Sequence, residues 1–214
     1  MVRNKHPEET INLILEVSLN LFMEKGYDNT TIQDIIKGLG GLSKGAIYHH
    51  FKSKEEIFAS VMAMIEKRNI AFFDNILNDS SLNGLEKLKS MLTSTYKNPN
   101  TSAFFKISPS YLEDPKVLYA QIVSNYQVAS PLYIQPVIEE GIGDGSIVTD
   151  YPKELAEVII TLMNVWINPI ASKSSIEDTH RKILFLKHTL ESLGINIIDE
   201  EMISQYITYI KANF

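Results

Sequence analysis

The sequence predicts an all-α fold, with an N-terminal domain of three short helices and a larger helical C-terminal domain. The alternation of apolar and polar residues that is typical of strands is confined to very short stretches. Helix start signals recur along the chain, and glycine or proline follows most of the periodic apolar segments. Short helices give way to longer ones near residue 52, so we predict domains of residues 1–52 and 53–214.

The composition is that of a globular protein, with 44% hydrophobic and 21% charged residues. The chain has no cysteine, which excludes disulfides and is compatible with the reducing cytoplasm, where we expect the protein to reside. The first residues lack the apolar core of a signal peptide. The longest apolar stretch, residues 158–170, is too short and too polar to span a bilayer, so we expect no membrane association.

The first predicted helix covers about residues 7–25. It starts with proline followed by acidic residues, a combination that favours a helix N-terminus. Gly26 ends it. Residues at helical spacing predict its buried face, namely Ile14, Ser18, Leu21 and Phe22.

Two more short helices are predicted at about residues 31–38 and 43–51, with a turn containing Gly40 and Gly41 between them. Thr31 begins a sequence that resembles a capping box. In the second of these helices, Ile47 and Phe51 share one face and can anchor the helix to the core. The residues left to face outward are Lys44, Gly45, Tyr48 and His49.

The basic residues of this region form a local window on an acidic chain. The formal net charge is −6, yet residues 37–54 contain four lysines and two histidines and no acidic residue. Such a window suits a partner of limited footprint, such as DNA. The alternative is a run of lysines on a solvated helix face.

The third helix carries the side chains that a helix in the DNA major groove requires. Ser43 at its N-cap leaves backbone amides free for a phosphate, and Lys44 can reach a phosphate or a guanine edge. Gly45 and Ala46 let the backbone approach the bases. Aromatic bodies with polar tips and further phosphate contacts come from Tyr48, His49, Lys52 and Lys54. The alternative is three helices packed around a glycine turn, as in many helical proteins.

Residues 30–36 (TTIQDII) and 42–57 (LSKGAIYHHFKSKEEI), with residues 21–27 (LFMEKGY) ahead of them, resemble the DNA-binding signature of the TetR (tetracycline-repressor-like) family. The resemblance covers about residues 10–60. It implies an all-helical homodimer that represses transcription and is released from DNA by a ligand in its C-terminal domain. One departure is that two adjacent glycines, Gly40 and Gly41, replace the single glycine of the family pattern, which bears on the angle of the third helix.

The residues and the resemblance together define a set of candidates for DNA contact. The set is Thr31, Gln33, Lys37, Ser43, Lys44, Gly45, Ala46, Tyr48, His49, Lys52 and Lys54.

The C-terminal domain is predicted to carry a dimer contact. A helix at about residues 152–170 is apolar on two faces, and one at about 175–193 has apolar residues close to heptad spacing. Two such helices suit a four-helix dimer interface, and packing within one chain is the alternative. The candidate interface residues are Ile160, Ile167, Ile183, Leu186 and Leu190.

Aromatic residues in the same domain predict a cavity for an unidentified small-molecule effector. Tyr119, Tyr126 and Tyr133 lie seven residues apart in a predicted helix that Pro131 and Pro136 kink. The lack of clustered Arg or Lys favours an apolar or aromatic effector over a polyanion, whereas the alternative is that these aromatics belong to the core. The candidate ligand-binding residues are Phe104, Tyr111, Tyr126, Met163 and Trp166.

No motif of an enzyme stands out. The glycine-rich residues 141–145 follow a predicted helix rather than a strand, and the histidines lack metal-ligand spacing, so we expect no cofactor, no metal and no catalytic residue. Three hypotheses remain open. The first is a ligand-responsive repressor that binds a palindromic operator as a homodimer. The second is a DNA-binding regulator whose C-terminal domain responds to a protein partner or has no effector, and the third and most distant is a small helical enzyme.

Overall fold

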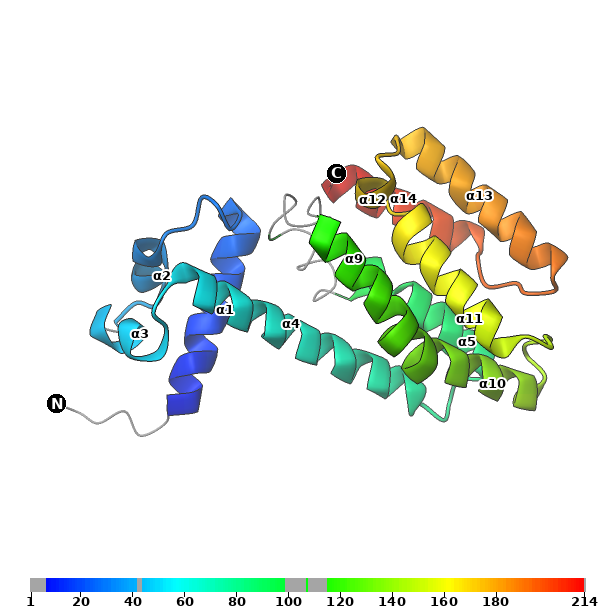
Figure 1. Cartoon of the computed structure of the whole chain (residues 1–214), viewed down its shortest axis with the longest axis horizontal. Helices are drawn as coiled ribbons and strands as arrows, with labels where there is room; N and C mark the ends of the chain where they lie inside the picture. The colour runs from blue at the N-terminus through cyan, green and yellow to red at the C-terminus, as the bar shows by residue number, and fades with distance from the viewer. Residues whose placement is uncertain (1–6, 42–43, 99–106, 108–114, 214) are drawn as a thin grey trace. The chain divides into compact units, whose positions relative to one another are not determined.

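The computed structural model describes residues 7–41, 44–98, 107 and 115–213, and every regular element within them is a helix (Figure 1). The predicted all-α class is therefore confirmed. The chain divides into two compact units. The first comprises Met1–Ile70 and Asn100–Pro109, and the second comprises Ala71–Pro99 and Ser110–Phe214.

The first unit contains α1 (Pro7–Lys25), α2 (Ile32–Gly38), α3 (Lys44–His50) and the N-terminal part of α4 (Lys54–Leu77). Ile14, Ser18 and Phe22 are fully buried, as the helical spacing predicts. The Ser18 hydroxyl donates to the carbonyl oxygen of Ile14 at 2.7 Å, so its burial leaves no unpaired donor. Leu21 packs against this core but is only partly buried.

The boundary between the units falls inside α4, later in the chain than the predicted boundary at residues 52/53. The reason is that the first turns of α4 bury Ile57, Val61 and Ile65 in the core of the first unit. Further along the same helix, Phe73 packs against the core of the second unit. A sequence boundary drawn where helix length changes cannot reveal that one long helix supplies both cores.

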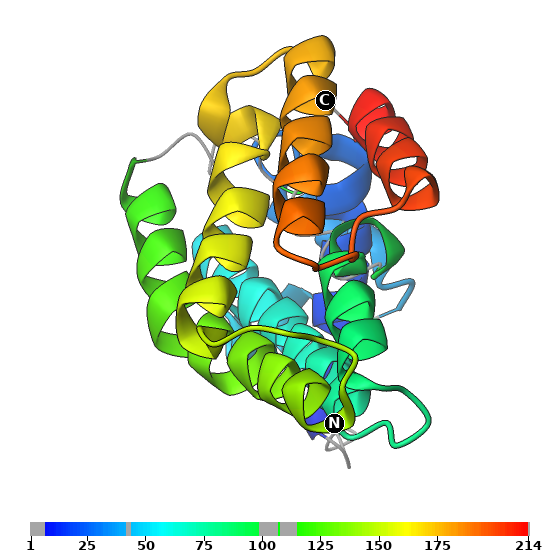
Figure 2. The ribbon, with the colours of Figure 1, turned by 90° about the vertical axis from the view of Figure 1, so that its right-hand side faces the viewer.

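The second unit is a helical bundle around a single apolar core (Figure 2). Besides the end of α4, its described elements are α5 (Gly84–Leu92), α6 (Ser94–Lys97), α9 (Pro115–Ser124), η1 (Asn125–Ile134), α10 (Gln135–Asp144), α11 (Pro152–Thr161), η2 (Leu162–Trp166), α12 (Pro169–Ser172), α13 (Ile176–Ser192) and α14 (Glu200–Asn213).

The predicted irregularity at Pro131 takes the form of a π-helical segment. α9, η1 and α10 follow one another without interruption, and Pro131 lies inside the π-helix η1. Proline has no amide to donate, and a π-helix is one of the local adjustments found where the regular hydrogen-bond ladder is broken. Pro136 lies in the first turn of α10, directly after the π-helix.

The five residues expected at a dimer contact lie instead in the protomer's own core. Their exposed fractions are between 1% and 8%, and all belong to the core cluster of the second unit: Ile160, Ile167, Ile183, Leu186 and Leu190. The prediction is corrected because the most apolar stripe of each helix turns toward its own bundle. The large apolar residues that α11 and α13 do expose include Val158, at 50%, and Phe185, at 63%.

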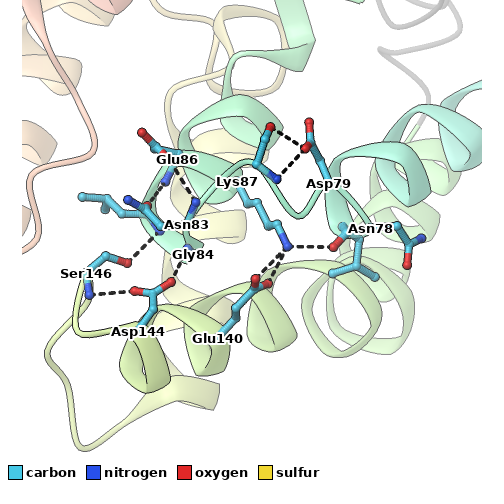
Figure 3. A network of polar contacts seen from close by, with 12 residues as sticks. Asn78, Asp79, Asn83, Gly84, Glu86, Lys87, Glu140, Asp144 and Ser146 are labelled. Atoms are coloured by element: carbon cyan, nitrogen blue, oxygen red, sulfur yellow. Dashed lines mark hydrogen bonds and ion pairs between the residues drawn. The ribbon is translucent and has the colours of Figure 1, made fainter.

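α5 and α10 cross at two glycines, Gly84 and Gly141. A Cβ atom on Gly84 would lie 2.2 Å from the backbone nitrogen of Gly141, closer than any real contact. The crossing is also bonded, since the Gly84 amide donates to Asp144 Oδ2 at 2.8 Å and the Leu85 amide donates to Ser146 Oγ at 3.1 Å (Figure 3). The first two amides of α5 thus find their acceptors at the C-terminal end of α10 and just beyond it.

Lys87 of α5 is buried beside this crossing, with an exposed fraction of 3%. Its ammonium group donates to both carboxylate oxygens of Glu140 in α10, at 2.7 and 2.8 Å, and to the carbonyl oxygen of Leu77 at 2.9 Å (Figure 3). Leu77 is the last residue of α4. One buried charge therefore ties α4, α5 and α10 together.

No helix in the described part of the chain is long and apolar enough to cross a membrane.

Replacing Gly84 with alanine should destabilise the second unit by about 1–3 kcal/mol, because the added methyl group forces the α5–α10 crossing apart. Gly143→Ala is the matched control, since a Cβ there meets nothing within 4 Å and the residue lies within α10. It should leave stability unchanged or raise it by about 0.4–1 kcal/mol. Urea unfolding of both variants measures the difference, and equal stabilities would show that the close crossing is absent.

Candidate nucleic-acid interface

α3 is held to the first unit by one face. Ile47 is fully buried, and Phe51, the residue after the helix, is nearly so. Both belong to the core cluster that contains Phe22 and Ile35, and the Phe51 amide donates to the carbonyl oxygen of Ile47 at 2.8 Å. The orientation of α3 is therefore determined by its apolar residues.

The opposite face of α3 is open to solvent, as the sequence predicts. Lys44, Gly45, Tyr48 and His49 are all exposed. The Lys44 ammonium lies 5.6 Å from the centre of the Tyr48 ring, within the range of a cation–π contact. The His49 and His50 rings meet edge to face, with centroids 4.9 Å apart. This face presents positive charge and aromatic groups with polar tips.

Ser43 lies outside the described residues, and the side chain of Ala46 is likewise not described.

Thr31 caps the N-terminus of α2, as predicted. Its hydroxyl oxygen accepts from the Asp34 amide at 3.2 Å, and Asp34 Oδ2 accepts from the Thr31 amide at 3.0 Å, which completes a capping box. The Thr31 hydroxyl also donates to Asp34 Oδ2 at 2.6 Å. Because this hydroxyl already has two partners, it is less available for a phosphate than Gln33 and Lys37, which are exposed on the same helix.

Asp34 is held in its ionised form by these contacts. The hydrogen bonds from the Thr31 side chain and backbone, and then the contact with Lys25 at 3.3 Å, lower its pKa from 3.8 to about 2. The carboxylate stabilises the N-terminus of α2 through the helix dipole as well. The N-terminus of α2 is therefore stabilised by the Asp34 carboxylate, which is held by hydrogen bonds to Thr31 and by the contact with Lys25.

The two glycines between α2 and α3 both adopt positive φ angles. Gly40 has φ of 61° and Gly41 has φ of 156°, a region that residues with a Cβ atom rarely adopt. The second glycine, which departs from the family pattern, thus has a conformational role in the turn. Gly38, the last residue of α2, has a different role. It lets α2 approach α1, since a Cβ atom at this position would lie 2.8 Å from Val17 Cγ1.

The two lysines after α3 are in different environments. Lys52 is exposed, as a phosphate contact requires. Lys54 instead donates to the carbonyl oxygen of Tyr27 at 2.9 Å, and its ammonium lies 4.2 Å from the centre of the Tyr27 ring. Lys54 therefore joins the start of α4 to the loop after α1, a role that its position in a basic window does not reveal.

Tyr27 is a structural residue that sequence reasoning did not single out. Its ring contacts those of Phe22 and Phe58, with centroids 5.6 and 4.4 Å apart. Its hydroxyl donates to Glu55 at 3.4 Å, and its burial, followed by the charge of Glu55, raises its pKa. The signals in the sequence were an aromatic residue directly after the glycine that ends α1 and its place at the end of the family-like run 21–27.

The start of α4 is capped slightly differently from the predicted pattern. Ser53 Oγ accepts from the Glu56 amide at 3.2 Å, as a capping box requires. The Glu56 carboxylate reaches back one residue further, however, and accepts from the Lys52 amide at 2.7 Å rather than from the amide of Ser53.

The described candidate ligand-binding residues have different surroundings. Phe104 and Tyr111 lie outside the described residues. Tyr126 is exposed, and its hydroxyl accepts from Thr161 at 3.2 Å. Trp166 packs edge to face on Phe185, with centroids 5.9 Å apart.

Met163 lines a small cavity in the second unit. Elsewhere, the described residues contain no group of three or more His, Cys, Asp or Glu that could hold a metal ion.

Comparison with known proteins places this interface in context. The sequence profile of the family described as "Bacterial regulatory proteins, tetR family" matches residues 14–61, which include α2, α3 and the start of α4.

The chain is also similar to curated repressors. It is 36% identical over 84 residues to the HTH-type transcriptional repressor KstR2 of Mycobacterium tuberculosis, a match that covers 39% of this chain and 41% of that protein. The chain thus spans about two fifths of the length of that relative. A second relative, the HTH-type transcriptional repressor AcnR of Corynebacterium glutamicum, is 25% identical over 172 residues, which cover 80% of this chain and 87% of AcnR.

Solved structures share the fold. A transcriptional regulator from Cytophaga hutchinsonii has a TM-score of 0.62 at 18% identity, over 96% of this chain and 94% of that one. A transcriptional regulator from Aquifex aeolicus has a TM-score of 0.52 at 25% identity, over 84% of this chain and 99% of that one. The helical arrangement of the chain therefore recurs in transcriptional regulators.

Asp34→Asn should destabilise the first unit at neutral pH, and the difference from the wild type should shrink in acid. Because the folded pKa of Asp34 is lowered to about 2, its contribution is complete above the ordinary value of 3.8 and is lost as the pH falls through about 2. Urea unfolding between pH 6 and pH 2.5 measures this profile. Glu24→Gln, which removes an exposed carboxylate from α1, is the control, and a loss of stability of equal size and pH dependence there would contradict the assignment to Asp34.

Proposed function

Because residues 14–61 match the tetR family of bacterial regulatory proteins, we propose that the chain is a transcriptional repressor of that family. In this proposal it binds a palindromic operator as a homodimer in the cytoplasm, and a small apolar or aromatic effector releases it. The matched family and relatives are regulators, so a small helical enzyme is set aside. The observation that carries the proposal is the solvent-exposed face of α3, in a window free of acidic residues.

The chemistry of α3 supports its insertion into the major groove. Lys44 can donate to a phosphate or to the O6 and N7 atoms of guanine, and Tyr48 offers a hydroxyl on an apolar ring. Gly45 lets the backbone approach the base edges. Lys37 precedes α3 in the sequence and Lys52 follows it, and both are exposed. In this proposal they neutralise DNA phosphates.

The proposed dimer contact lies on the exposed faces of α11 and α13, because the predicted interface residues are buried within the protomer. Val158 and Phe185 are large apolar groups that remain half or more exposed. The Phe185 ring packs edge to face on the Trp166 ring. The carbonyl oxygen of Trp166 in turn accepts a hydrogen bond from Lys182 at 3.0 Å. An exposed aromatic on a rigid helix is a typical anchor of a protein interface.

Lys44→Ala and Tyr48→Ala should each weaken operator binding by about 1–3 kcal/mol, because each substitution removes a group that contacts a base or a nearby phosphate. The measurement is a mobility-shift titration with DNA from upstream of the chain's own gene. Lys67→Ala, which removes an exposed lysine from α4 in the same unit, is the matched control and should change the affinity little.

Wild-type affinity should also fall steeply as salt rises, since phosphate contacts release counterions. Unchanged affinity in both the Lys44 and Tyr48 variants would contradict the placement of α3 in the groove. A lack of preference for any upstream DNA over random DNA would contradict operator binding itself.

Phe185→Glu should shift the protein from dimer to monomer at micromolar concentration, because it places a charge in the proposed apolar contact. Sedimentation velocity measures the oligomeric state. His180→Glu is the control, since His180 is exposed on α13 but faces the groove toward α14. If the Phe185 variant remains dimeric, the contact lies elsewhere on the second unit.

A further inference from the structure

The turn between α2 and α3 begins with the two most flexible residues that a chain can have. Gly40 and Gly41 both adopt positive φ angles, and a Cβ atom at either position would meet nothing within 4 Å. Glycine has the largest conformational freedom and offers no side chain for packing. The angle between α2 and α3 therefore depends on how the two ends of the α2–turn–α3 segment, residues 32–50, are held.

One side chain joins these two ends. The chain enters α2 from the loop of residues 26–31, and it leaves α3 through residues 51–53 to reach α4, which begins at Lys54. The Lys54 ammonium group donates to the carbonyl oxygen of Tyr27 at 2.9 Å and to that of Asp28 at 3.5 Å. Both acceptors belong to the entry loop, so Lys54 links the entry of the segment to its exit.

Tyr27 holds the start of α4 in three ways. Its carbonyl oxygen accepts from Lys54, and its ring lies 4.2 Å from the Lys54 ammonium, which makes a cation–π contact. Its hydroxyl donates to Glu55, the second residue of α4, at 3.4 Å. Its ring also packs on that of Phe58, with centroids 4.4 Å apart.

The short connections on either side of this contact are themselves hydrogen-bonded. On the entry side, the Tyr27 carbonyl oxygen also accepts from the amide of Thr30 at 3.2 Å, and Thr30 is fully buried just before the cap of α2. On the exit side, the Glu56 carboxylate accepts from the Lys52 amide at 2.7 Å. A displacement of the Lys54 contact is therefore passed on to both α2 and α3.

These contacts occupy Lys54. An ammonium group has three N–H donors. Two carbonyl oxygens and one ring face account for that number. Lys52, two residues earlier, is exposed and is the better placed of the two lysines for a phosphate.

From this geometry we propose that Lys54 is a positioning residue of the DNA interface. It joins the two ends of the α2–turn–α3 segment, so that α3 presents its outer face at one angle, and it does so without contacting DNA. This role replaces the phosphate contact expected for Lys54 from the sequence. The inference rests on the proposed function for the binding of an operator, and it supplies the constraint that Gly40 and Gly41 leave open.

Lys54→Met tests the inference in the full chain. Mobility-shift titrations measure affinity for the upstream fragment that the wild type prefers and for random DNA of equal length. Random DNA is bound through phosphates alone, whereas the preferred fragment is also bound through its bases, which requires the correct angle of α3. The variant should bind the preferred fragment about five- to a hundredfold more weakly, the range for one base contact, and random DNA within about twofold of the wild type.

Lys52→Met is the matched control, and salt separates the two roles. Each lost phosphate contact reduces the slope of log affinity against log salt concentration by about 0.9. Lys52→Met should therefore weaken binding to both DNAs by the same factor and reduce the slope by that amount. Lys54→Met should leave the slope at its wild-type value.

Two further variants keep the test decisive if Lys54→Met folds poorly. Lys54→Gln removes the charge but can still donate to the Tyr27 carbonyl oxygen, so it should lose part of the preference with an unchanged salt slope. Tyr27→Phe removes the hydroxyl and leaves the ring and the carbonyl, so it should keep the preference. Circular dichroism melting verifies that each variant is folded at the assay temperature.

Three outcomes overturn the inference. The first is that neither Lys54 variant lowers the preference, even if the melting temperature falls, since Lys54 would then only stabilise the fold. The second is an equal loss of affinity for both DNAs, and the third is a slope reduced by about 0.9, since each indicates a direct phosphate contact. A wild-type protein that prefers no upstream fragment contradicts the proposed function itself, and the inference falls with it.

Discussion

The second unit depends on the burial of one charge, the ammonium group of Lys87. Removing an ion from water costs several kcal/mol unless its donors are all satisfied. Here the acceptors come from two other helices, the Glu140 carboxylate of α10 and the Leu77 carbonyl at the end of α4. α4, α5 and α10 must therefore meet in one arrangement, and the contact of Gly84 with Gly141 makes that arrangement close.

The same constraint joins α5 to α4. Lys87 of α5 donates to the last carbonyl of α4, and Leu92, little more than one helical turn further along α5, is buried in the core of the second unit. The first turns of α4 belong to the core that positions α3, through Ile57 and Val61. α4 therefore supplies side chains to the cores of both units.

The helices of the first unit could be predicted from the sequence because their signals are local. Helical spacing predicted the burial of Phe22 and Ile47, and the capping residue Thr31 marked the start of α2. Residues whose roles depend on distant partners could not be predicted. Nothing in the sequence near Lys54 says that its ammonium lies on Tyr27, and a heptad-like stripe does not say whether it faces its own bundle or a second copy. The buried interface candidates, such as Leu186, were misassigned for that reason.

The charge balance connects the proposed dimer to DNA binding. One copy offers few cations to DNA, since Lys54 is occupied by Tyr27 and the chain as a whole carries a formal net charge of −6. The exposed lysines left in the acid-free window are Lys37, Lys44 and Lys52. Because the electrostatic part of affinity scales with the number of phosphates neutralised, three lysines against an acidic background should bind weakly, and two such windows in the proposed dimer should bind far more tightly. In this reading the exposed Phe185 matters to operator affinity although it lies in the other unit, because it determines whether two windows act together.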